Sequence, residues 1–103
     1  MSLEARLDEL ERRLAEIEAE WAKPEVAADP ARSKVLGREQ ARISPIVDNY
    51  RALRDTRAAL DSARHELHAE DDPELKELAR ELIAENEAEV ERLNEELRVQ
   101  LLP

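Results

Sequence analysis

The chain has 103 residues, of which 41% are charged and 42% are apolar, and its formal net charge is −10. This length suits a single domain, and the negative charge disfavours general binding to nucleic acid or to anionic membranes. The absence of cysteine excludes disulfides and thiolate metal sites and is typical of a cytoplasmic protein. No apolar run approaches the ~20 residues that a bilayer-spanning helix needs, so we expect no membrane partner.

The first predicted helix begins after Ser2 and ends before Pro24. Its apolar positions alternate in spacing between four and three residues, which is a heptad seam on one helix face: Leu3, Leu7, Leu10, Leu14, Ile17 and Trp21. Ser2 is a suitable N-cap. Pro24 ends the helix because a proline ring forbids the continuing hydrogen bond. Residues 24–30 are expected to form a connector that contains, at most, a short helical turn.

The second helix is predicted over residues 30–70, with Asp29 as N-cap and Pro30 in the first position. Seven apolar residues share one heptad frame: Leu36, Ile43, Ile46, Tyr50, Leu53, Leu60 and Leu67. Val47 and Ala63 lie beside this frame. Gly37 and Pro45 are unfavourable inside a helix. The frame stays in phase across Pro45, so we predict one kinked helix there. The alternative is a break that would give four helices.

The third helix is predicted over residues 73–100, after the start signal Asp72-Pro73. Its apolar frame consists of Leu75, Ala79, Ile83, Asn86, Val90, Leu93 and Leu97, and Leu78 and Leu82 are expected to widen it. The preceding loop of about three residues makes the last two helices antiparallel neighbours. We therefore predict one all-α domain over residues 1–103, an elongated antiparallel three-helix hairpin or bundle with coiled-coil-like packing.

Basic residues concentrate in the middle of this sequence. Lys34, Arg38 and Arg42 are four residues apart and share a helix face, and a second row follows at Arg51, Arg54 and Arg57. Such rows can bind phosphates. The neighbouring helices are acidic, however, and ion pairs between helices are the favoured interpretation. For Trp21, packing against the core is favoured over a role as a partner anchor.

Catalytic and metal sites are not indicated. His65 and His68 lie one turn apart, but a structural metal site normally needs four ligands and the chain has no further histidine or cysteine. There is no glycine-rich phosphate loop and no nucleophile motif. We therefore expect no enzyme, no cofactor and no metal.

Several motifs, in order, resemble the helical N-terminal domain of class I bacterial peptide chain release factors. They are Pro24-Glu25-Val26, Leu36-Gly37-Arg38-Glu39, Pro45-Ile46-Val47, the segment Asp72-Pro73-Glu74-Leu75-Lys76-Glu77-Leu78-Ala79, and Leu101-Leu102-Pro103. The resemblance covers nearly the whole chain. It is nearest to the factor 1 branch, which reads UAA and UAG, and the factor 2 branch is the alternative.

The resemblance implies a domain that docks on the ribosome at the stalk base, near a ribosomal protein and rRNA, and that influences handover to the GTPase-class release factor. The codon-reading motif and the Gly-Gly-Gln loop of the family are not expected in this chain, whose one glycine is Gly37, and no termination activity is expected of it by itself. Loops often carry the residues that contact a partner, so Glu70 and Asp71, in the loop between the last two predicted helices, are candidate partner contacts. The other candidates are Trp21, Lys34, Arg38 and Arg42. The alternative function is a self-associating coiled-coil module that forms a homodimer.

Overall fold

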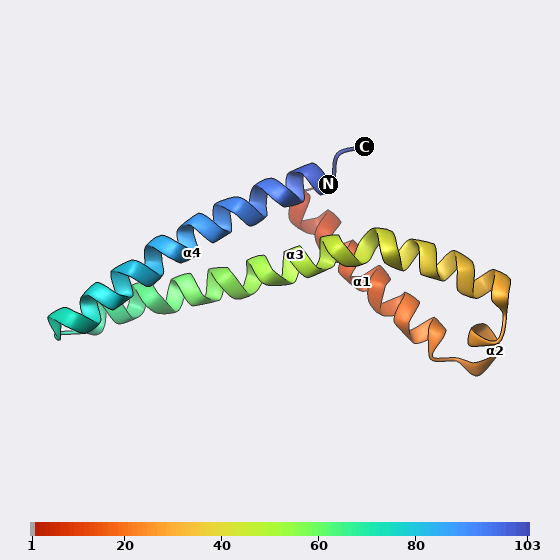
Figure 1. Ribbon diagram of the computed structural model, residues 1–103, viewed down its shortest axis with the longest axis horizontal. Helices are drawn as coiled ribbons and strands as arrows, with labels where there is room; N and C mark the ends of the chain where they lie inside the picture. Colours follow the sequence, from red (N-terminus) through yellow and green to blue (C-terminus); the bar gives the residue numbers. More distant parts are fainter. Residues whose placement is uncertain (1) are drawn as a thin grey trace. The chain divides into compact units, whose positions relative to one another are not determined.

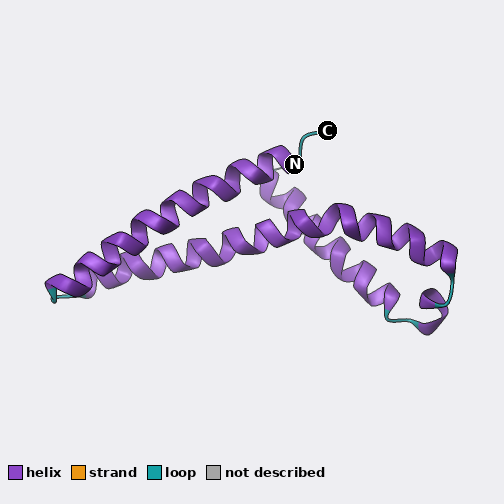
Figure 2. Cartoon of the chain, viewed as in Figure 1, coloured by secondary structure: helices purple, strands orange, loops and turns teal. Residues whose placement is uncertain are grey.

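The computed structural model describes residues 2–103, and every regular element in this range is an α-helix. In chain order the elements are α1 (Leu3–Trp21), α2 (Pro24–Ala27), α3 (Pro30–Ala69) and α4 (Pro73–Gln100). Only short turns separate them (Figure 2). The prediction of an all-α chain of antiparallel helices is confirmed.

The three long helices begin at the capping residues expected from the sequence. The Ser2 hydroxyl accepts a hydrogen bond of 3.1 Å from the backbone amide three residues later. Asp29 accepts from the amides two and three residues later, at 3.1 and 3.2 Å. Asp72 accepts from the amide two residues later at 2.8 Å. Each cap satisfies backbone donors that have no partner within the helix.

The interior of α3 settles the question raised by Pro45. The helix runs from Pro30 to Ala69 with Pro45 inside it, so the prediction of a single helix is confirmed and the alternative of a break there is wrong. The kink at Pro45 stays a prediction. A fourth helix exists elsewhere, because the connector after α1 contains the single turn α2 with Pro24 at its start. Apolar packing on both sides of Pro45 outweighs the loss of one backbone hydrogen bond.

The chain divides into two compact units, residues 1–48 and residues 49–103, which share α3. In the first unit, α1 runs antiparallel to the N-terminal half of α3 (Figure 1). Arg13 faces Glu39, and Glu20 faces Arg32. The core of this unit is a cluster of fully buried aliphatic side chains: Leu14, Ile17, Leu36, Ile43 and Val47.

The second unit pairs the C-terminal half of α3 with α4 in the antiparallel sense (Figure 1). The Asn49 side-chain amide donates a hydrogen bond of 3.0 Å to Gln100 Oε1, so this half of α3 begins where α4 ends. The buried side chains come from the predicted frames of both helices: Tyr50, Leu53, Leu60, Ala63, Ala79, Leu93 and Leu97.

Part of the expected apolar stripe of α4 is not buried near the start of the helix. Leu75, Leu78 and Leu82 are 49%, 52% and 37% exposed, whereas Ala79 is buried. Since α4 has one partner helix in this unit, only the side that faces α3 is covered. Ala79 occupies that side and the three leucines lie along its edge.

Candidate functional site

The turn between α3 and α4 holds two of the predicted contact residues. The Glu70 carboxylate accepts hydrogen bonds from the backbone amides of Asp71 and Asp72, at 3.1 and 3.0 Å. Glu70 is half-buried, while Asp71 is exposed. Glu70 therefore shapes the turn, and Asp71 is the more accessible of the two for a partner.

The first basic row lies on the exposed face of α3, in the unit formed with α1. Lys34, Arg38 and Arg42 are all exposed. Among the described residues, no ion pair joins any of the three to a carboxylate. The favoured interpretation, that this row pairs with the acidic neighbouring helices, is therefore wrong.

The ion pairs between α1 and α3 use other arginines. Arg13 from α1 donates two hydrogen bonds of 2.7 Å to the two carboxylate oxygens of Glu39 on α3, and Arg32 reaches Glu20 at 2.8 Å. The bidentate geometry lowers the pKa of Glu39, chiefly through the hydrogen bonds from Arg13, and it raises the pKa of Arg13. Arg42 contributes to Glu39 only through its longer-range charge. Heptad position alone did not distinguish the paired arginines from the unpaired ones.

The second basic row is engaged within the fold. The Arg54 guanidinium lies over the ring of Tyr50, 4.9 Å from its centroid, which is within the range of a cation–π contact. Arg51 and Arg57 also interact with other groups of the chain. This row is therefore a weaker candidate for binding phosphates than the first.

Trp21 occupies the end of the α1 seam and is half-buried. It packs against the aliphatic cluster of the first unit, together with Leu10 and Val26. Its ring also covers Gly37 of α3, where an added Cβ would lie 3.5 Å from the ring atoms Cη2 and Cζ2. These contacts support the packing interpretation of Trp21.

The two histidines lie on the surface near the end of α3. His65 Nδ1 is 2.8 Å from the backbone oxygen of Asp61, one turn earlier, and His68 is exposed. Within residues 2–103, no group of three or more histidine, aspartate or glutamate side chains is arranged to hold a metal ion. Asn86, placed by the sequence in the apolar frame of α4, is half-buried.

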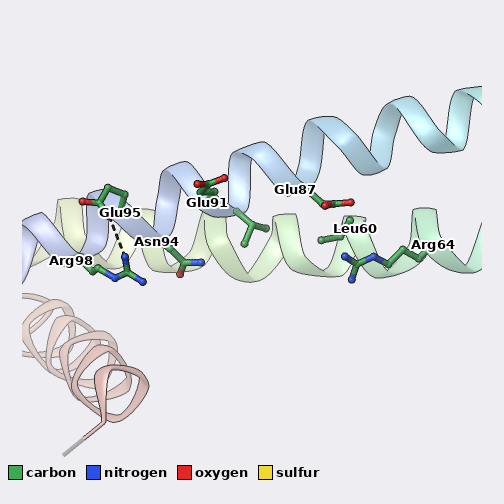
Figure 3. Close-up of a pocket in the computed structure, with 8 residues that line it drawn as sticks. Leu60, Arg64, Glu87, Glu91, Asn94, Glu95 and Arg98 are labelled. Carbon is green, nitrogen blue, oxygen red and sulfur yellow. Dashed lines mark hydrogen bonds and ion pairs between the residues drawn. The ribbon is translucent and has the colours of Figure 1, made fainter.

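An open groove with a volume of about 670 Å³ lies between α3 and α4. Leu60 and Arg64 line it from α3, and Asn94, Glu95 and Arg98 are among its lining residues from α4 (Figure 3). In the part of the chain that the structure describes, no polar or charged residue is buried. General acid–base chemistry relies on groups perturbed by desolvation, and this groove offers none.

Among the helices of residues 2–103, none has the length and hydropathy of a membrane-spanning segment.

Two comparisons with known proteins match most of the chain. A profile of the PCRF domain matches residues 10–103. Peptide chain release factor 1 of Sorangium cellulosum (strain So ce56) is 39% identical to the chain over 99 residues, which make up 96% of this chain and 26% of that protein. The chain thus spans about a quarter of the length of this curated relative. No solved structure matches the chain.

Proposed function

Because this chain belongs to the PCRF domain family, we propose that it is the ribosome-docking domain of a peptide chain release factor, a cytoplasmic protein of translation termination. The observation that carries the proposal is the family match, which extends over residues 10–103. Identity of 39% to a release factor 1 favours the factor 1 branch.

The proposed partner is the stalk base of the large ribosomal subunit, both its protein and the adjacent rRNA. Two helix pairs with short turns are a suitable scaffold, because contacts carried on rigid helices cost little conformational entropy on binding. The net charge of −10 suits a basic ribosomal protein better than bare rRNA. A role in handover to the GTPase-class release factor is part of the same proposal.

We propose no catalytic role for the domain and no termination activity by itself. The groove between α3 and α4 is open, and its carboxylates have ordinary solvent access. What the chain contributes is binding and positioning.

Co-sedimentation with purified large ribosomal subunits, with and without the stalk-base protein, tests the proposal. We expect the domain to pellet with complete subunits and to remain in the supernatant when the stalk-base protein is missing. Equal pelleting in both cases would place docking elsewhere on the subunit. No pelleting at high micromolar concentration would contradict docking by this domain.

A contact with rRNA through Lys34, Arg38 and Arg42 is a second candidate, favoured because these three side chains are exposed and form no ion pair with a carboxylate of residues 2–103. Phosphate contacts release counterions, so such binding weakens steeply with salt, and each lost contact lowers the logarithmic salt slope by about 1. The Lys34→Gln/Arg38→Gln/Arg42→Gln variant should therefore bind less tightly and with a shallower slope. An unchanged slope would contradict the rRNA contact.

The alternative function, a self-associating coiled-coil module, predicts a homodimer. Sedimentation equilibrium over a range of concentrations separates it from ribosome docking. A concentration-dependent dimer that does not bind subunits would favour the coiled-coil module.

A further inference from the structure

Three exposed leucines lie on one face of α4, near its start. Seven large apolar side chains are exposed within residues 2–103, and three of them, Leu75, Leu78 and Leu82, lie in the first two and a half turns of α4. Their spacing of three and four residues places them on one helix face. Single exposed leucines need no explanation, but clustered ones mark an interaction surface. We call this surface the leucine strip.

A small depression lies where the leucine strip meets α3. Its volume is about 80 Å³, and it is lined by Glu66, Glu70, Leu75, Leu78 and Ala79. This exceeds the ~10–15 Å³ that a single water needs. The floor is apolar and the α3 side is acidic, so the depression suits one apolar side chain that is presented from a basic surface.

Acidic residues surround the leucine strip. The sequence from residue 66 to residue 85 contains eight acids and two bases, Lys76 and Arg80. Glu66 flanks the strip from α3, and Glu70 flanks it from the turn that follows α3. On α4, the helical period puts Glu74, Glu81 and Glu85 along its other side. An apolar centre within a charged rim is the usual anatomy of a protein interface.

The rim determines what can cover the leucine strip. A second copy of this chain would bring a second acidic rim against the first, and like charges at close range disfavour that pairing. Nucleic acid and anionic membranes are repelled for the same reason. We infer that the leucine strip docks a basic amphipathic protein helix, whose apolar side chains contact the leucines and whose lysines or arginines face the rim. This inference holds whether or not the partner belongs to the ribosome.

A synthetic amphipathic helix of leucine and lysine is the probe, with its binding to the 103-residue chain measured by fluorescence anisotropy. The Leu78→Gln/Leu82→Gln variant should bind about tenfold or more weakly, because the complex loses the burial of two apolar side chains. Val99→Gln/Leu102→Gln is the matched control, since these side chains are also apolar and exposed. It should bind like the unsubstituted chain, and equal weakening in both variants would overturn the inference.

Two further measurements test the chemistry of the partner. A probe with glutamate in place of lysine should not bind, and Glu81→Lys/Glu85→Lys should weaken binding of the lysine probe. All substituted side chains are exposed, so circular dichroism should show unchanged helix content. Binding of the glutamate probe, or a dimer that Leu78→Gln/Leu82→Gln dissociates, would overturn the inference.

The ribosome assay separates this inference from the proposed function. If the probe binds the unsubstituted chain more tightly than the double-leucine variant, and the domain does not pellet with ribosomal subunits, the result would support docking at the leucine strip and contradict ribosome docking. Pelleting that requires the stalk-base protein, together with a probe that binds the double-leucine variant as well as the unsubstituted chain, would support docking and overturn the inference.

Discussion

Replacement of the one glycine, Gly37, should stabilise the protein although it lies in the interior of a long helix against an aromatic ring. Gly37 is within α3, and no described residue has a positive φ, so its backbone conformation does not require glycine. A Cβ at this position would lie 3.5 Å from two ring atoms of Trp21, an ordinary van der Waals distance. Nothing needs to move to accommodate alanine.

The magnitude follows from the helical environment. Glycine is about 0.8–1.0 kcal/mol less favourable than alanine in a helix interior, because the unfolded chain loses more conformational freedom. The added methyl also contacts the ring. Gly37→Ala should therefore raise the free energy of unfolding by about 1 kcal/mol and the melting temperature by about 4–8 °C. Gly37→Val should lower stability, by about 1–3 kcal/mol, because its branched methyls would displace the ring.

Trp21 is the only tryptophan, so its fluorescence reports directly on this contact. Denaturant titrations followed by tryptophan emission and by circular dichroism give the change in stability. The emission maximum should not change in Gly37→Ala and should shift to longer wavelength in Gly37→Val. A destabilised Gly37→Ala, or a red-shifted emission in that variant, would refute the geometry of this contact.

Three further substitutions test the core, an ion pair and a cap. Leu36→Ala should cost about 2–5 kcal/mol, because Leu36 has no exposed surface, whereas Val35→Ala next to it, 54% exposed, should stay within about 0.5 kcal/mol in denaturant melts. Since the pKa of Glu39 is lowered in the folded state, its contribution is present above the ordinary value of 4.5 and is lost as the pH falls through the folded value. Glu39→Gln should therefore be less stable than the unsubstituted chain at neutral pH, with a gap that closes in acid; a gap independent of pH would contradict this. Asp72→Ala should remove the α4 cap and cost about 1 kcal/mol, while Asp71→Ala should change thermal stability little.

The sequence predicted the helices well because their signals are local. Capping residues at Ser2, Asp29 and Asp72 bond to amides within a few positions of themselves, so neighbouring sequence decides where each helix starts. The apolar frame of α3 stays in phase across Pro45, and for that reason a continuous helix could be predicted there. The family resemblance could also be recognised from the order of short motifs, and the PCRF domain match over residues 10–103 agrees with it.

The candidate site was less predictable, because the choice among similar charges depends on distance. Lys34, Arg38 and Arg42 and the paired arginines Arg13 and Arg32 all lie on helices beside acidic neighbours. Ion pairing requires contact within a few ångströms, and only the packing of α1 against α3 brings Arg13 to Glu39. Only the folded structure therefore shows that Lys34, Arg38 and Arg42 are unpaired while Arg13 and Arg32 are paired.

By itself the sequence determined the all-α class, the helix starts and the apolar faces, since these depend on backbone propensity and periodicity along one chain. The tertiary structure alone decided which parts of those faces are covered. Periodicity places Leu78 and Leu82 beside Ala79 on an apolar side of α4, but burial also requires a neighbouring helix against that part of the side. One partner helix covers Ala79 and leaves the two leucines exposed, and that difference creates the surface proposed here for docking.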